Sequence, residues 1–495
     1  MSASASLERR AISLGSAYAI DYGLQFILPV VLTRALDRYE FGEYRLLWLA
    51  TSTLLMIMPM CMPESLYYFM PRSDARGRRL YLNQCLVFLA LAAVVSAWIM
   101  SPLDPWLPAS MHGLMADAGG VVPLFTALWI FSWVLDVLPT VEERVVWQAK
   151  AIVGLSAMRA VALSAAALMT GDLVAVLWVL AAFTGFKATL LLVYVARFHG
   201  LRGPWVEGKA LAEQVKQAAP FALSGGLHGL RAQGDQWIVA TLFAVTQYAS
   251  FSVATVMAPM VQMFRQSVNH VFMPSMSRVH SSGDLRTMLA LNSRANAMVA
   301  LMVYPLLAFA FAFAEPVISL IYTNAYVDAA PIMRIYIVGL CAMVVELVSL
   351  LFLLKEGPFA ARVNALVLVF ALPLSYWGAM TWGLPGAALG SVAAIFAERA
   401  LSLVRIASRT QIRVRELQDW TGLAGILAAA ILSAGIAAFA MHFTHWPAFA
   451  TLAAGGTVLA IAYPGALCLT GQKRCLTSFI ASIRHTGAQP EPAAE

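Results

Sequence analysis

Long runs of apolar residues recur along the whole chain and constrain its fold more than any other feature. Each run reaches the roughly 20 residues that a helix needs to cross a bilayer, and about fourteen such runs can be placed between residues 11 and 470. Only 12% of the residues are charged, whereas soluble proteins carry about 25%. A soluble enzyme or a nucleic-acid binder fits this composition poorly. The sequence therefore predicts an all-α polytopic membrane protein.

The expected spans follow one another with short links. They are residues 11–33, 45–63, 81–101, 120–141, 151–170, 173–196, 218–242, 248–273, 291–314, 332–354, 361–380, 384–406, 419–440 and 447–470.

Lys and Arg residues gather in every second loop, which indicates the orientation of the chain. The links 71–80, 197–217 and 407–418 are rich in arginine, whereas 243–247 and 441–446 contain neither Lys nor Arg. Basic loops face the cytoplasm, so both termini are expected there. The same rule accounts for the net charge of +7 without a nucleic-acid partner.

Two further patterns limit the chemistry. The five cysteines are scattered and form no Cys-x-x-Cys pair, so we expect neither a metal site nor a disulfide framework. We also expect no cofactor. The external loops 102–119 and 315–331 are too short for a folded domain. Because membrane enzymes of glycan assembly need catalytic residues on a sizeable loop, we expect a protein that is not an enzyme.

A weak internal repeat divides the chain. The segment after the first span, LTRALDRYEFGEYRLLWLAT, aligns with VATLFAVTQYASFSVATVMA after the seventh span, so that Gly42 meets Ala249. A repeat six spans apart predicts two pseudo-symmetric six-helix bundles that rock around a central cavity. The expected parts are an N-terminal bundle (1–196), a cytoplasmic linker (197–217), a C-terminal bundle (218–407), two peripheral helices (408–470) and a cytoplasmic tail (471–495).

Ionisable and amide side chains inside the spans are the candidate site residues, because they are costly in a membrane and usually face a cavity. In span eight, four of them recur on one helix face, from Gln262 to Asn269. Basic residues outnumber acids in this set, and arginine binds phosphate through its planar fork. The sequence therefore predicts an anionic substrate. The candidates for substrate binding are Arg34, Arg159, Lys187, Arg231, Gln262, Arg265, Gln266 and Asn269, and those for ion coupling are Asp21, Asp235 and Glu346.

Structural roles remain open for several of these residues. Arg159 and Lys187 could extend to a membrane interface. Asp235 could neutralise Arg231 four residues earlier, and Asp21 and Glu346 could make polar contacts between helices.

Several segments resemble the polysaccharide and O-antigen flippase family of the multidrug/oligosaccharidyl-lipid/polysaccharide exporter superfamily. They are TRALDRYEFGEYRLLWL after the first span, MPESLYYFMPR ending at Arg72, GDQWIVATLFAVTQYASFSVA, which contains Asp235, and VFMPSMSRV, which contains Pro274 and Ser275. The chain departs from the family pattern at Asp37 and Ala249, where glycine is expected.

The resemblance implies a flippase in the bacterial cytoplasmic membrane, working with glycosyltransferases and a glycan polymerase. Its substrate would be an undecaprenyl-pyrophosphate-linked oligosaccharide, moved by alternating access and driven by protons or sodium ions. Arg34 carries over as a cation at the mouth of the cavity. Two alternatives remain, namely a multidrug-type cation exporter of the same superfamily and a membrane glycan polymerase or ligase.

Overall fold

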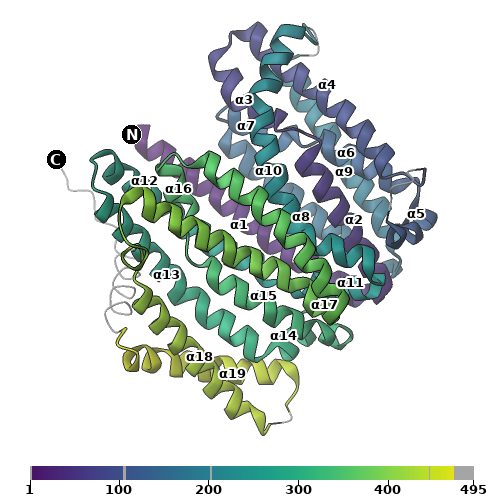
Figure 1. The fold of residues 1–495 in the computed structure, drawn as a ribbon. Coiled ribbons are helices and arrows are strands. Elements are labelled where there is room, and N and C mark those ends of the chain that lie inside the picture. Colours follow the sequence, from purple (N-terminus) through teal and green to yellow (C-terminus); the bar gives the residue numbers. More distant parts are fainter. Residues whose placement is uncertain (1–2, 104–107, 201–202, 445, 473–495) are drawn as a thin grey trace, which may run out of the picture. The chain divides into compact units, whose positions relative to one another are not determined.

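The computed structural model describes residues 3–103, 108–200, 203–444 and 446–472, and the regular elements in this part of the chain are all helices. Figure 1 shows long helices joined by short links. The predicted all-α class is confirmed, whereas most of the tail expected at 471–495 lies outside the described residues. The structure groups into two units, residues 1–249 and 250–495, which are described one at a time. The five-part division expected from the repeat stays a prediction.

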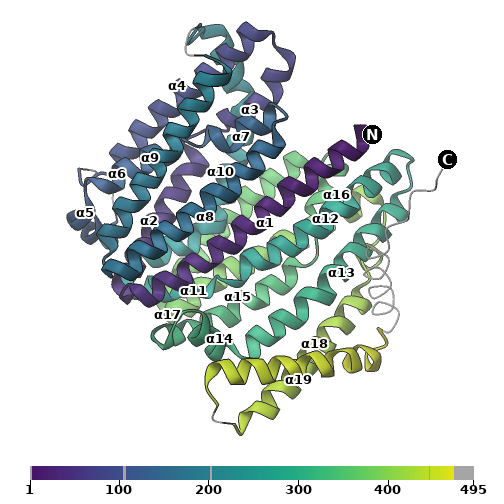
Figure 2. The same cartoon turned by 180° about the vertical axis from the view of Figure 1, so that it is seen from behind.

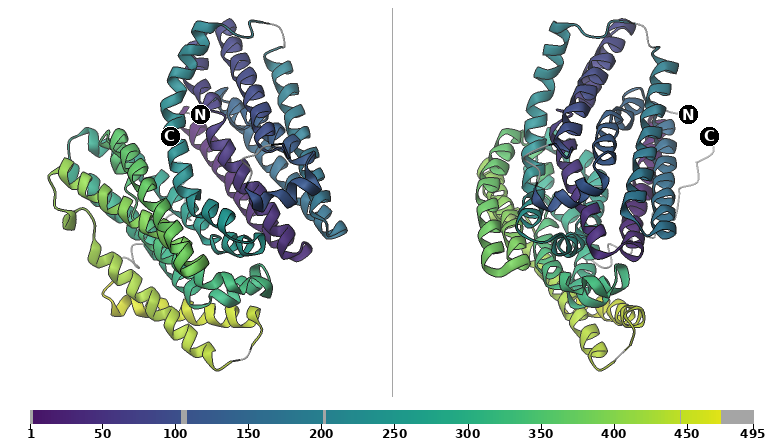
Figure 3. Two further views of the ribbon diagram at one scale, coloured as in Figure 1. Left: turned by 45° about the vertical axis from the view of Figure 1, so that its right-hand side comes forward. Right: turned by 90° about the vertical axis from the view of Figure 1, so that its right-hand side faces the viewer.

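Unit 1 is built from helices that run side by side (Figure 3). Its α-helices are α1 (Ala3–Ala35), α2 (Arg38–Ile57), α3 (Met62–Phe69), α4 (Ala75–Ile99), α5 (His112–Ala118), α6 (Val121–Phe131), α7 (Val134–Val141), α8 (Val145–Thr170), α9 (Leu173–Phe198) and α10 (Gly208–Leu242). Short 3₁₀ turns lie at Met70–Arg72 and Ala109–Met111, and α11 (Val245–Ala254) crosses from unit 1 into unit 2.

Two contacts organise unit 1. Helix α1 packs along α8, as Figure 2 shows, and α10 packs against α2. The second contact is partly polar, because Gln233 Nε2 donates to Ser52 Oγ at 3.0 Å and Thr53 Oγ1 donates to Gln233 Oε1 at 2.7 Å. Buried amides and hydroxyls that satisfy one another can hold membrane helices together where no hydrophobic driving force separates helix from lipid.

The start of α2 explains the Phe-Gly motif found in the sequence. Asp37 accepts a hydrogen bond from Glu40 N at 2.7 Å, and Glu40 Oε2 accepts one from Asp37 N at 3.1 Å. This reciprocal capping box gives a physical reason for an aspartate where the family pattern has glycine. Gly42 is required by close packing, because a Cβ there would lie 2.5 Å from the carbonyl oxygen of Val245.

Unit 2 contains the remaining helices. They are α12 (Met257–Ser281), α13 (Leu285–Ala312), α14 (Ala314–Ile321), α15 (Ala330–Met343), α16 (Val348–Leu353), α17 (Gly357–Thr410), α18 (Trp420–His442) and α19 (Ala448–Leu469), with 3₁₀ turns at Asn324–Ala329 and Val414–Glu416. Helix α13 packs against α12 and α18, α15 packs against α17, and α18 pairs with α19.

Helix α17 is two antiparallel arms joined at Gly383, whose φ of +67° favours glycine. The arms approach closely through small residues, since a Cβ at Gly390 would lie 2.5 Å from Ser375 N and 2.7 Å from Ala371 O. Figure 1 shows the two arms side by side. Gly386 and Gly390, four residues apart, therefore let the two arms pack closely.

Within the described residues, 11 helices are long and apolar enough to cross a membrane, fewer than the fourteen spans expected. Part of the difference is α17, which counts once but contains two expected spans. The other two missing spans are α10 and α12. These helices have 35 and 25 residues, but they carry many of the polar candidate residues and are therefore not apolar enough to be counted as membrane spans. The protein is a multi-pass membrane protein.

Candidate functional site

A polar site that contains candidate residues is found in each unit. In unit 1 a cavity of about 410 Å³ lies among α1, α3, α6, α7, α8 and α9. Its wall includes Tyr18, Asp21 and Gln25, which repeat along one face of α1 as the sequence spacing predicts. Arg159 of α8 and Lys187 of α9 also line it. Three of the predicted charged residues thus converge on one cavity.

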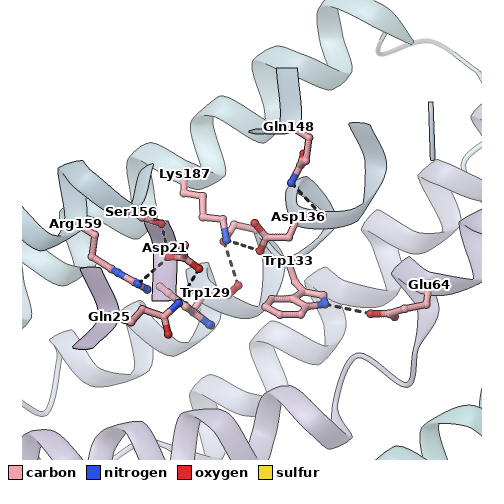
Figure 4. Close-up of polar contacts among 11 residues, drawn as sticks. Asp21, Gln25, Glu64, Trp129, Trp133, Asp136, Gln148, Ser156, Arg159 and Lys187 are labelled. Atoms are coloured by element: carbon pink, nitrogen blue, oxygen red, sulfur yellow. Dashed lines mark hydrogen bonds and ion pairs between the residues drawn. The ribbon is translucent and has the colours of Figure 1, made fainter. Parts of the chain in front are cut away.

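Both basic residues of this cavity contact carboxylates, as Figure 4 shows. Arg159 Nη2 lies 3.7 Å from Asp21 Oδ1, and Lys187 Nζ lies 2.6 Å from Asp136 Oδ2. Asp21 also accepts hydrogen bonds from Gln25 Nε2 at 2.7 Å and from the hydroxyl of Ser156. These geometries show ion pairs within the bundle rather than side chains that extend to a membrane interface.

Aromatic rings complete the wall. The Trp129 ring centroid lies 5.2 Å from Lys187 Nζ and 5.8 Å from Arg159 Cζ, within the range of cation–π attraction. Trp133 Nε1 donates to Glu64 Oε1 at 3.4 Å. The cavity therefore has three carboxylates, from Asp21, Glu64 and Asp136, for two basic groups. The basic excess expected from the sequence is wrong for this cavity, because Glu64 and Asp136 add two carboxylates to its wall.

The site in unit 2 forms where a helix is interrupted. Helices α15 and α16 are separated by residues 344–347, which are not helical. Such a break leaves backbone carbonyl and amide groups without helical partners. Glu346 lies in the break, and its Oε1 accepts from the backbone amides of Val348 at 2.8 Å and Ser349 at 3.3 Å. Arg265 Nη1 points to the carbonyl oxygen of Met343 at 3.4 Å.

Arg265 and Glu346 also bind each other, with Nε 3.2 Å from Oε2. Arg265 Nη2 donates to Gln262 Oε1 at 2.7 Å, and Ser349 Oγ donates to Asn269 Oδ1 at 2.9 Å. Arg265 and Glu346 are only 9% and 8% exposed, so the pair is almost fully shielded from solvent. Four of the predicted residues therefore meet in one network at the broken helix.

Two asparagines of α13 hold the broken segment from the other side. Asn292 Nδ2 donates to the carbonyl oxygen of Glu346 at 3.1 Å, and Asn296 Oδ1 accepts from its backbone amide at 3.0 Å. Asn296 in turn donates to Gln418 Oε1 at 2.9 Å. The non-helical backbone is thus satisfied by side chains, which fixes the position of the Glu346 carboxylate.

The other predicted residues lie outside these two sites. Arg34 is exposed near the end of α1 and donates to Val30 O at 2.7 Å. Gln266 is exposed on α12. On α10, Arg231 is half-buried and Asp235 is buried, with its Oδ1 accepting from the amide of Gln236 at 2.8 Å. The roles predicted for these four residues remain predictions.

Three charged residues in or near these two sites are not among the sequence-based candidates. Asp136 and Glu64 lie in or beside expected spans, so their presence in apolar surroundings was a usable signal. Arg399 falls inside the expected span 384–406 but is not among the candidate site residues. In the structure it lies in the second arm of α17 and is 7% exposed.

Comparison with solved structures identifies the fold. The chain resembles lipid II flippase MurJ in an inward closed conformation, with a TM-score of 0.70 and 11% identity over 92% of this chain and 99% of that one. It also resembles a mutant of the MATE transporter VcmN from Vibrio cholerae, with a TM-score of 0.54 and 10% identity over 83% and 97% of the two chains.

A third similar structure is a MOP superfamily transporter from Pyrococcus furiosus, whose binding pocket is described as having reverse polarity. Its TM-score is 0.53 at 12% identity, over 81% of this chain and 95% of that one. At such identities the likeness establishes the fold, which is that of MOP superfamily transporters. No curated protein sequence matches the chain.

The family follows from the sequence itself. Residues 31–331 match the family described as polysaccharide biosynthesis protein, which is more than half of the 495 residues. The matched region includes the Phe-Gly segment of α2, the part of the unit 1 cavity that lies beyond α1, and the Arg265 side of the unit 2 network. The protein therefore belongs to the polysaccharide biosynthesis protein family, with the membrane-transporter fold seen in MurJ and MATE proteins.

Proposed function

We propose that the protein is a flippase that moves an undecaprenyl-pyrophosphate-linked oligosaccharide across a bacterial inner membrane by alternating access. One combined observation carries this proposal. A chain of the polysaccharide biosynthesis family shares its fold, over 92% of its length, with a protein named as a lipid II flippase. In this proposal the chain spans the membrane fourteen times, as two six-helix halves and two further helices, with both termini in the cytoplasm.

The proposed cargo carries a diphosphate, so cations must bind it. We assign this role to Arg34, Arg159, Lys187, Arg231 and Arg265, with the amides Gln262, Gln266 and Asn269 as hydrogen-bonding groups. Three of these cations already contact carboxylates, namely Arg159, Lys187 and Arg265. An incoming phosphate must therefore compete with a resident carboxylate for the same donors.

This competition supplies a physical basis for ion coupling. A proton or sodium ion that binds Asp21 or Glu346 weakens the hold of that carboxylate on its arginine. The freed guanidinium then binds the anionic cargo more tightly, so the two binding events favour one conformation together. Asp235 is the third proposed coupling residue, because it is a buried acid on α10.

A second candidate function is export of organic cations. One specific observation favours it, because the unit 1 cavity combines three carboxylates with Tyr18, Tyr67, Trp129 and Trp133. Acidic groups and aromatic rings suit a cationic substrate. The Arg265 network in unit 2 favours the flippase, since a guanidinium at a broken helix suits an anion.

Reconstitution with two cargoes separates these functions. The purified protein is placed in proteoliposomes that contain either a fluorescent undecaprenyl-pyrophosphate oligosaccharide or a fluorescent organic cation. A flippase makes the oligosaccharide accessible to a membrane-impermeant quencher faster than empty liposomes do, and leaves the cation where it is. Transport of the cation without movement of the glycolipid would instead establish an exporter.

A further inference from the structure

The second arm of α17 carries an arginine in its buried face. Val392, Arg399, Ser402 and Ile406 are 7%, 7%, 2% and 0% exposed. Their spacing of three to seven residues places them along one side of the helix. Arg399 therefore occupies a position where a membrane helix ordinarily has an apolar or small residue.

The contacts of α17 show what this face meets. A Cβ at Gly339 of α15 would lie 3.2 Å from side-chain atoms of Val392 and Ile395, and Arg399 is one helical turn beyond Ile395 on the same side. Arg399 is also close enough to Arg265 for their positive charges to repel each other. Arg399 thus faces the part of unit 2 that contains the α15–α16 break.

Within the described residues, Nε and Nη1 of Arg399 differ from the corresponding groups of the other arginines of this arm. Arg405 Nε lies 2.9 Å from Glu356 Oε2, and Arg409 pairs with the other oxygen of the same carboxylate. By contrast, neither Nε nor Nη1 of Arg399 has a hydrogen-bond partner among the residues that the structure describes. Glu346 is already occupied by Arg265 and by the amides of α16.

Water could accept hydrogen bonds from Nε and Nη1 if the Arg399 side chain extended to the membrane surface, but the helix geometry opposes such an extension. Side chains of an α-helix lean toward its N-terminus, so Arg399 leans toward Ile395 and away from the end of the arm at Thr410. Charge alternation predicts that the Thr410 end is the cytoplasmic one. Burial of two guanidinium donors without acceptors is unfavourable, so an acceptor from outside the protein would stabilise this arrangement.

We propose that Arg399 forms an anion subsite beside the Arg265–Glu346 pair, and that its ligand is a phosphate group of the lipid-linked diphosphate. The assignment to a diphosphate rests on the proposed function. The chemistry itself requires only phosphate oxygens, which accept strong charge-assisted hydrogen bonds from a guanidinium. Phospholipid headgroups offer the same oxygens, so the test must separate these two sources.

The test measures thermal unfolding of the full-length protein in detergent, with inorganic pyrophosphate, farnesyl pyrophosphate or phosphatidylglycerol as the probe. Pyrophosphate and farnesyl pyrophosphate should raise the midpoint of the unmodified protein. Arg399→Met should unfold at a higher temperature than the unmodified protein when no anion is present, because the uncompensated charge is gone. The same variant should bind pyrophosphate about tenfold or more weakly, and Arg399→Lys should keep part of the affinity.

Arg362→Met is the matched control, because Arg362 is an exposed arginine on the first arm of α17. It should change neither the midpoint nor the affinity. An Arg399→Met variant that is destabilised equally with and without anion would show a structural residue and overturn the proposal. The proposal would also be overturned if Arg399→Met bound pyrophosphate as tightly as the unmodified protein does. The same holds if phosphatidylglycerol were the only probe whose stabilising effect depended on Arg399.

The outcomes also separate this inference from the proposed function. If the protein moves the glycolipid but its pyrophosphate binding does not depend on Arg399, the subsite is overturned and the proposed function is not. Arg399-dependent pyrophosphate binding without any glycolipid movement would overturn the flippase and leave the subsite in place.

Discussion

At the scale of single residues, Glu346 links the charge of Arg265 to the backbone of a broken helix. Its carboxylate contacts Arg265 and two amides of α16, so neutralising it leaves a buried guanidinium without its counter-charge and weakens the hydrogen bonds from the α16 amides. We predict that Glu346→Gln lowers the free energy of unfolding by about 3–5 kcal/mol. Denaturant unfolding in detergent measures this.

The double variant Arg265→Met, Glu346→Gln decides between a structural and a functional role. Because the unpaired charge is then absent, it should recover at least half of the stability lost in Glu346→Gln. A double variant as unstable as the single one would show that Arg265 does not depend on Glu346.

A second residue-scale prediction concerns Glu142, which lies just beyond α7. Burial opposes ionisation of Glu142, but hydrogen bonds from His199 and Tyr194 and the charge of Arg144 prevail and lower its pKa. A lowered pKa means that the ionised carboxylate stabilises the fold above its ordinary pKa of 4.5, and that this stability is lost as the pH falls through the folded-state pKa.

Glu142→Gln should therefore be less stable than the unmodified protein at neutral pH, and the two should converge as the solution is acidified. Thermal unfolding midpoints over that range measure the difference. A difference that stays constant with pH would mean that the ionisation of Glu142 does not contribute.

At the scale of elements, the arms of α17 depend on close backbone contact. A methyl group at Gly390 would lie 2.5 Å from Ser375 N, so Gly390→Ala must push the arms apart and should cost about 1–3 kcal/mol of stability. Gly435→Ala is the control, because nothing lies within 4 Å of a Cβ on that helical glycine. The control should be neutral or slightly stabilising. Equal stability of both variants in detergent would contradict the observed packing.

The elements also show what the sequence could predict and what it could not. The class and most spans follow from local apolar character, and the small-residue spacing at Gly386 and Gly390 is typical of closely packed membrane helices. The break between α15 and α16 was missed, because 332–354 reads as one apolar run and the side chains that satisfy the break come from α12 and α13. Charge partners such as Lys187 and Asp136 were missed for the same reason, since they are distant in sequence and meet only in the folded unit.

At the scale of the whole molecule, the alternation of basic loops predicts the orientation in the membrane. A single cysteine introduced at 441–444 should react with a membrane-impermeant maleimide added outside the cell, whereas one at 411–416 should not. The experiment needs a background in which the five native cysteines are replaced. The reverse labelling pattern would overturn the orientation and, with it, the predicted cytoplasmic termini.

The central claim is that a polar interior built around Arg265 moves an anionic glycolipid. The most direct measurement is the initial rate of glycolipid movement in proteoliposomes that contain equal amounts of folded unmodified protein, Arg265→Ala or Arg265→Lys. We predict that Arg265→Ala lowers the rate by about ten- to a hundredfold, as loss of a charge-assisted hydrogen bond implies, and that Arg265→Lys restores part of it, since lysine keeps the charge but not the planar fork. A rate in Arg265→Ala equal to that of the unmodified protein would contradict the claim.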